Sequence, residues 1–189
     1  MSPSSVRSPR TAVAGLGSGL GAGVLGYLLV YLATAGTIRN SAAFGFLEAF
    51  GSELSVWQVV GWSFLNVHGV KTLVPGLFGS TSSVDLVGTT EAFSPLLYAV
   101  PVVCLLAGGA AAATLSRASS PADGALSGAM VAFGYFVVAV AGLFAFTVSF
   151  GGNVVRPDPV TTVLLAGLVE PVALGGVGGA VAGAVRGGS

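Results

Sequence analysis

Four long stretches, without a charged residue except for one acid in the last, limit what this chain can fold into. They cover residues 12–36, 95–115, 124–150 and 160–185. A helix needs about 20 apolar residues to cross the hydrocarbon core of a bilayer, and each stretch is long enough. Inside lipid every backbone N–H and C=O must find a partner within the protein, which a helix achieves by itself. The sequence therefore predicts an all-α fold, an integral membrane four-helix bundle.

A Ser-Pro or Asp-Pro pair stands at or before the start of each stretch. The pairs are Ser8-Pro9, Ser94-Pro95, Ser120-Pro121 and Asp158-Pro159. A Ser or Asp oxygen can accept hydrogen bonds from the free N–H groups at a helix start, and Pro suits the first position because its missing N–H is not needed there. The pairs therefore predict where the four helices begin.

Composition favours a membrane protein and excludes an ordinary soluble domain. Charged residues make up 7% of the 189 residues, and the mean hydropathy is +0.91, whereas about a quarter of a soluble domain is charged. No segment is long and polar enough for a second domain, so residues 1–189 are expected to form a single transmembrane domain. The net charge is zero, which gives no sign of a nucleic-acid partner. The only cysteine, Cys104, is expected to be a buried apolar residue.

The charges outside the predicted helices fall into two groups. At the chain ends and around residues 116–123 stand Arg7, Arg10, Arg117, Arg186 and Asp123. In the 38–94 connection and the 151–158 turn stand Arg39, Lys71, Arg156, Glu48, Glu53, Asp85, Glu91 and Asp158. Basic residues concentrate on the cytoplasmic side of a membrane. We therefore expect a multi-pass cell-membrane protein with its N- and C-termini in the cytoplasm.

The first stretch has a second interpretation. Arg7 and Arg10, the apolar run and Ala33-Thr34-Ala35 resemble a secretory signal with its cleavage site. The apolar run is longer than the roughly 7–15 residues of a signal. We therefore expect a retained first helix, with cleavage as the alternative.

The 38–94 connection is the only substantial segment outside the predicted spans. Ser55 followed by Gln58 fits a capping box. It predicts an outer interfacial or re-entrant helix over about residues 56–67, with Trp57 and Trp62 as anchors at the level of the lipid headgroups. Val74-Pro75-Gly76 is typical of a turn.

A fifth span over residues 55–78 is the alternative to that helix. It would place His68 and Lys71 in lipid, at a cost of several kcal/mol, and would move Arg117 and Arg186 to the outside. We therefore interpret His68 and Lys71 as surface charges. A single histidine without a neighbouring cysteine does not predict a zinc site.

Segments of the first and second halves resemble each other. Residues 26–33 are similar to 134–141, and residues 101–112 to 171–182. Two duplicated helical hairpins with the same orientation would be related by an axis along the membrane normal. Chance similarity between apolar segments is the other explanation.

Two helices carry glycines at every fourth position. The stripes are Gly15, Gly19 and Gly23 in the first span, and Gly175, Gly179 and Gly183 in the fourth. Small residues at this spacing let a second helix approach closely. The stripes predict helix packing, either within the chain or with another copy.

Glu170 is the one acid inside a predicted span, and Pro171 follows it. Pro171 removes one backbone hydrogen bond and tends to kink the helix. An ionisable group within a membrane suggests a proton carrier, a cation ligand or a substrate contact. A hydrogen-bonded acid that only supports the bundle is the alternative.

In its glycine, alanine and valine content, its single lysine and its acidic outer loops, the chain resembles small multi-pass membrane proteins of unknown function from haloarchaea. This resemblance implies a four-helix membrane fold and no particular activity.

No catalytic set, cofactor-binding motif or metal-binding motif is present in the sequence. We therefore expect a non-enzymatic accessory or structural subunit that acts through helix–helix association, with itself or with another membrane protein. The alternative is a small transporter or channel component that uses Glu170 in the membrane.

Overall fold

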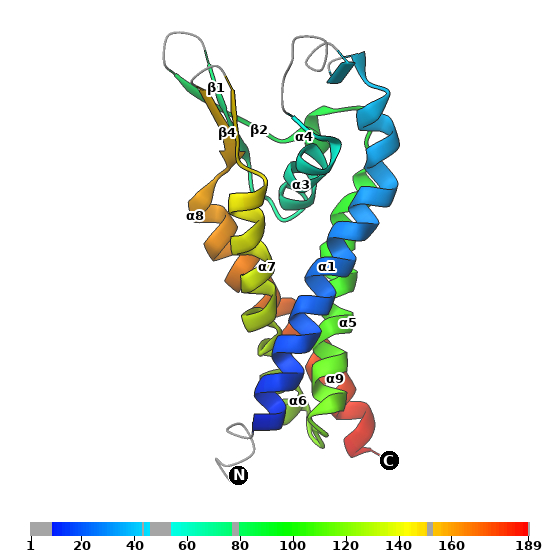
Figure 1. Ribbon diagram of the computed structural model, residues 1–189. Helices are drawn as coiled ribbons and strands as arrows, with labels where there is room; N and C mark the ends of the chain where they lie inside the picture. Colours follow the sequence, from blue (N-terminus) through cyan, green and yellow to red (C-terminus); the bar gives the residue numbers. More distant parts are fainter. Residues whose placement is uncertain (1–8, 43, 46–53, 77–79, 151–152, 189) are drawn as a thin grey trace.

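The computed structural model describes residues 9–42, 44–45, 54–76, 80–150 and 153–188. Four helical rods form the bundle (Figure 1). They are α1 (Pro9–Arg39); η2 (Pro95–Tyr98) with α5 (Ala99–Leu115); α6 (Pro121–Ala129) with α7 (Val131–Ala145); and α8 (Pro159–Thr161) with the π-helix η3 (Thr162–Val169) and α9 (Glu170–Gly187). Each rod is long and apolar enough to cross a membrane. The predicted four-helix membrane fold is confirmed at this level.

Three of the four predicted helix starts lie among the described residues and are capped as expected. The Ser94 hydroxyl accepts from the Leu96 N–H, the Ser120 hydroxyl from the Asp123 N–H, and the Asp158 carboxylate from the Thr161 N–H. Ser8 lies outside the described residues, as do Arg7, Glu48 and Glu53. A proline follows each of the three caps at the first helical position, where its missing N–H costs nothing.

A small antiparallel sheet, which was not expected from the sequence, lies in the connections between the rods at the end away from the chain termini. Its strand order is β2-β1-β4-β3, with β1 at Thr72–Pro75, β2 at Thr81–Val84, β3 at Val148–Phe150 and β4 at Asn153–Pro157. Thr72 pairs with Val84 on one side and with Pro157 on the other. The sheet therefore joins the outer connection of the first two rods to that of the last two.

The sheet corrects two predicted boundaries. The third span ends at Ala145 rather than at residue 150, because residues 148–150 pair with β4 instead of continuing the helix. The predicted turn at residues 74–76 begins only at Gly76, whose N–H donates to the Ser80 carbonyl at 2.8 Å. Val74 and Pro75 still belong to β1.

The predicted outer helix is present as α3 (Val56–Asn66), too short to cross a bilayer. The Ser55 N–H donates to Gln58 Oε1 at 3.0 Å, one half of the expected capping box. Seven consecutive residues, 60–66, are buried, and α3 lies between α1 and α7 (Figure 1). The helix thus enters the space between the rods, with its C-terminal end pointing into the bundle. The short helix α4 (Leu86–Thr89) packs beside it.

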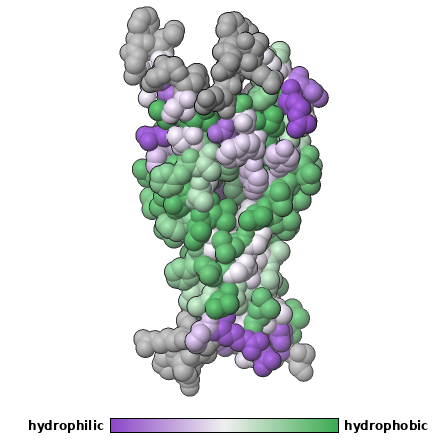
Figure 2. Space-filling view, viewed as in Figure 1, coloured by the Kyte–Doolittle hydropathy of each residue, from purple (hydrophilic) through white to green (hydrophobic). Residues whose placement is uncertain are grey.

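Hydropathy divides the molecule into three zones. On the face shown in Figure 2 an apolar band covers the middle, and hydrophilic residues gather toward both ends. The first and last described residues lie at one end, called here the terminal end, and the sheet lies at the other (Figure 1). This distribution is what a bilayer around the four rods requires.

Candidate functional site

Three polar side chains from different elements meet inside the bundle. The Glu170 carboxylate, at the start of α9, contacts Nδ1 of His68, and the hydroxyl of Tyr135 in α7 lies 2.8 Å from Nε2 of the same imidazole. The His68 side chain is 0% exposed and that of Glu170 is 24% exposed. Tyr135 is fully buried. We call these residues the Glu170–His68–Tyr135 cluster.

The interpretation of His68 as a surface charge is wrong. His68 follows α3, and the re-entrant path of that helix carries the imidazole to the middle of α7 and the start of α9. A charged group buried in a membrane protein needs a partner. His68, the only histidine of the chain, is the partner of Glu170. Lys71, in contrast, is half exposed, and its ammonium donates to Asp85 at 2.9 Å.

The backbone turn after α3 places His68. Gly69 has a φ of +73°, a left-handed conformation that a residue with a Cβ rarely adopts. A Cβ at this position would also lie 3.2 Å from the Leu165 side chain on η3. Gly69 therefore both reverses the chain and lets it approach the fourth rod.

Asn66 fastens the same turn. Its Nδ2 donates to the Val70 carbonyl at 2.7 Å and to the Thr72 hydroxyl at 3.3 Å, and its Oδ1 accepts from the Leu86 N–H at 2.7 Å. The side chain is buried. Because three hydrogen bonds to different segments converge on it, Asn66 fixes where the re-entrant segment ends.

Pro171 explains the backbone around Glu170. A proline inside a helix cannot donate to the carbonyl four residues earlier, and its ring clashes with that carbonyl. Just before it, the Glu170 N–H donates to the Leu165 carbonyl, five residues back, at the end of the π-helix η3. Such wider turns occur often at functional sites. Here the widened turn presents Glu170 to His68.

Aromatic rings enclose the imidazole on its α3 side. The Phe64 ring lies edge-on to His68, with centroids 5.2 Å apart, and Tyr27 of α1 packs on Phe64 at 5.9 Å. A Cβ on Gly26 would lie 3.8 Å from the Tyr135 hydroxyl and 3.9 Å from Cys104 Sγ, which places both atoms against α1. Cys104 is buried, as predicted.

The cluster can hold one additional proton. With Glu170 ionised and His68 neutral, Nδ1–H donates to the carboxylate and Nε2 accepts from the Tyr135 hydroxyl. When a proton is added, Nε2–H donates to the Tyr135 oxygen and the Glu170–His68 pair becomes neutral overall. In each state both ring nitrogens of His68 have a hydrogen-bond partner. Since a net charge is costly away from water, binding of the proton removes a net negative charge from the interior.

The glycine stripes pack inside the chain. A Cβ on Gly19 would lie 2.1 Å from the Val131 carbonyl oxygen, and one on Gly179 would lie 2.1 Å from that of Gly124. A Cβ at the other four stripe positions would also be too close to a neighbour: 2.3 Å at Gly15 from Met130, 3.0 Å at Gly23 from Val138, 2.6 Å at Gly175 from Gly128 and 2.3 Å at Gly183 from Ser120. The stripes thus join α1 to the α6–α7 rod, and α9 to α6.

The two tryptophans differ. Trp57 is 42% exposed and stacks edge-on against Phe146 at 6.0 Å, which suits the predicted headgroup anchor. Trp62 is only 7% exposed, and its Nε1 donates to the Phe146 carbonyl at 2.6 Å. It therefore locks α3 to the end of α7 instead of anchoring the protein to headgroups.

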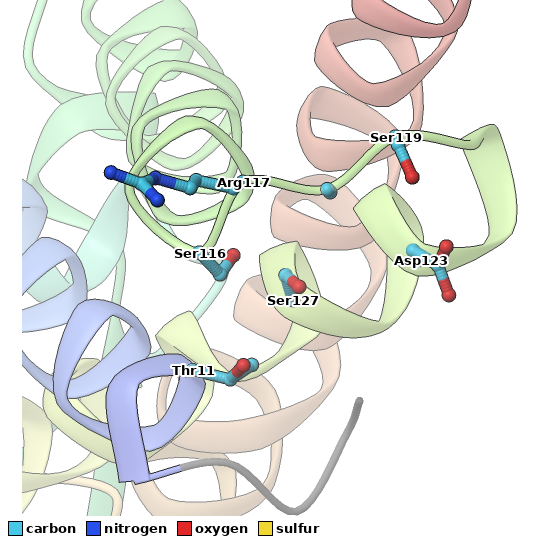
Figure 3. A pocket seen from close by; sticks show the side chains of 7 residues that line it. Thr11, Ser116, Arg117, Ser119, Asp123 and Ser127 are labelled. Atoms are coloured by element: carbon cyan, nitrogen blue, oxygen red, sulfur yellow. The ribbon is translucent and has the colours of Figure 1, made fainter. Parts of the chain in front are cut away.

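A second polar region lies at the terminal end. A cavity of about 110 Å³ is lined by Thr11, Ser116, Ser119, Asp123 and Ser127, while the Arg117 side chain points away from it (Figure 3). The described residues contain no group of three or more His, Cys, Asp or Glu placed to hold a metal ion. The Glu170–His68–Tyr135 cluster is therefore the stronger candidate for a functional site.

Comparison with known proteins gives a family without an assigned activity. The model of DUF7978, described as a family of unknown function, matches residues 1–186. This match does not connect the chain to haloarchaea. No curated protein and no solved structure matches it.

Proposed function

The chain belongs to DUF7978, a family of unknown function, and we propose that it is a non-enzymatic membrane protein that carries protons through the Glu170–His68–Tyr135 cluster. The contact between Glu170 and His68 inside four apolar rods carries this proposal. Histidine and carboxylate side chains in membrane interiors form proton relays in pumps and transporters. The role is that of a small transporter or channel component.

The arrangement of elements supports transfer in addition to storage of a proton. The imidazole uses both ring nitrogens, one toward α9 and one toward α7, so a proton accepted at one nitrogen can leave from the other. The re-entrant segment that carries His68 is an irregular backbone at membrane depth, which is tolerated where it is buried in protein or lines a path.

Proton flux into proteoliposomes with a trapped pH-sensitive dye tests this proposal. Glu170→Gln keeps the size and the hydrogen-bonding ability of the side chain but cannot ionise, and His68→Gln removes the two-sided relay. We expect each variant to lose at least about tenfold in flux, as for a lost general acid or base. Glu91→Gln, an exposed carboxyl-to-amide change near the sheet, is the matched control and should conduct like the wild type.

Each outcome decides between roles. If the wild type conducts protons and Glu170→Gln conducts equally, the cluster is structural and the mechanism fails. If the wild type moves no protons, the result favours the role of an accessory or structural subunit over proton transport. That role was suggested by the glycine stripes, but these glycines pack against other helices of the same chain. Support for it would therefore have to come from partners that co-purify from native membranes.

The orientation belongs to the same proposal. Arg10, Arg117 and Arg186 lie at the terminal end with Asp123 as the only described acid there, whereas the segments at the sheet end hold Arg39, Lys71 and Arg156 together with Asp85, Glu91 and Asp158. The positive-inside bias supports a terminal end in the cytoplasm and a sheet on the outer face.

A further inference from the structure

A groove between α1 and α5 opens on the outside of the bundle. Near the terminal end it has a volume of about 410 Å³ and is lined by residues that include Arg10, Gly17, Ser18 and Leu115. Beyond Ser18 it continues as a second hollow of about 340 Å³ that reaches Leu25 and Cys104. Both parts share Ser18, so the groove follows α1 from residue 10 to residue 25, about 22 Å at a rise of 1.5 Å per residue.

The two glycines of α1 that line the groove do not pack against another part of the described chain. A Cβ on Gly17 or Gly21 would meet nothing within 4 Å, in contrast to the stripe that begins at Gly15. In a bilayer such a hollow is occupied by a lipid chain or by another helix, because empty space beside the helix forfeits dispersion contacts. The length of the groove exceeds the roughly 15 Å of one hydrocarbon leaflet.

Positive charge stands at one end of the groove. Arg10 donates from Nε to the Leu115 carbonyl at 2.8 Å, and its terminal nitrogens form no hydrogen bond or ion pair with another described residue. Arg117, two residues after Leu115, is exposed, and its side chain forms no hydrogen bond or ion pair within the described part of the chain. A guanidinium offers paired N–H donors that match the oxygens of a phosphate.

We propose that this groove binds an anionic phospholipid, with one acyl chain along Gly17 and Gly21 and the phosphate at Arg10. A second copy of the chain is the less suitable occupant. A symmetric pair would use the same surface on both copies and would gather Arg10 and Arg117 of both at one place, where like charges repel. An anionic headgroup neutralises them.

Native mass spectrometry of the detergent-purified full chain tests the site, with phosphatidylglycerol and phosphatidylcholine of identical acyl chains as probes. We expect the wild type to retain phosphatidylglycerol about fivefold better, the factor expected for one arginine near the surface. Arg10→Gln should reduce that preference to parity. Gly17→Leu with Gly21→Leu should fill the groove and abolish retention of both lipids without lowering the melting temperature of the lipid-free protein. Gly36→Leu, another open position on α1, is the control and should bind like the wild type.

Three results would overturn the proposal. Equal retention of the two lipids by the wild type would remove the role of the phosphate. Unchanged retention in the Gly17→Leu, Gly21→Leu variant would show that the lipid binds elsewhere. A wild-type dimer that this variant converts to a monomer would identify a second copy as the occupant.

Discussion

At the scale of single residues, the role of Glu170 depends on its contact with His68. A carboxylate in a membrane span is costly unless it is paired, and a residue 102 positions earlier in the chain supplies the partner. Tyr135 was noticeable in the sequence only within a segment that resembles residues 26–33. Its hydroxyl completes the hydrogen bonding of the imidazole.

Replacing Tyr135 by Phe removes this hydroxyl and leaves the ring in place. We expect a loss of about 0.5–1.5 kcal/mol in the free energy of unfolding, the typical net value of one hydrogen bond, and a lower proton flux, because Nε2 loses its partner. Detergent unfolding and the liposome assay measure the two effects. Wild-type flux in Tyr135→Phe would remove Tyr135 from the path.

Asp85, outside the spans, gives a prediction about pH. Partial burial raises the pKa of the Asp85 carboxyl. The hydrogen bond from the Gly88 N–H and the charge of the Lys71 ammonium together lower that pKa by more than burial raises it, so it lies below the ordinary value. A depressed pKa stabilises the folded state above the unfolded pKa, and this contribution is lost as the pH falls through the folded pKa.

The melting temperature of the wild type should therefore exceed that of Asp85→Asn at neutral pH by a constant margin. The margin should shrink as the pH approaches about 3, below the usual range of an aspartate. Melting curves of both proteins in detergent across this range make the comparison. A margin that stays the same in acid would contradict the assigned role of Asp85.

At the scale of elements, close approach of helices depends on particular glycines. The helices whose sequences resemble each other are also neighbours in the fold, since α1 packs against α7 and α5 packs against α9. The duplication itself stays a prediction. The glycine stripes form the contacts of α1 with the α6–α7 rod and of α9 with α6, so their replacement should affect the fold of one chain before any assembly.

Gly179→Ala and Gly176→Ala form a matched pair on α9. The new Cβ at 179 would lie 2.1 Å from the Gly124 carbonyl oxygen, whereas at 176 the nearest atom is 3.7 Å away. We expect Gly179→Ala to destabilise the protein by about 1–3 kcal/mol, as overpacking does, and Gly176→Ala to be neutral or slightly stabilising. Unfolding titrations of both variants decide the matter. Equal stabilities would argue against a tight α6–α9 contact.

At the scale of the whole molecule, topology can be tested directly. On a Cys104→Ser background, Ser119→Cys should react with an impermeant thiol reagent only when the cytoplasmic side is open, and Ser82→Cys should react from the outside. Both serines are exposed. Labelling of residue 119 from the outside of intact cells would exclude the proposed four-span orientation.

The membrane class, the four rods, three capped helix starts and the existence of α3 could be predicted from the sequence, because they depend on local composition and on side chains a few residues apart. The position of His68, the burial of Trp62 and the pairing of residues 148–150 with β4 became evident only in the folded chain. Those features depend on contacts between segments far apart in the chain. Short outer strands and a re-entrant turn leave little periodicity to read. The partner of an isolated acid is set by how the rods cross, which no local pattern encodes.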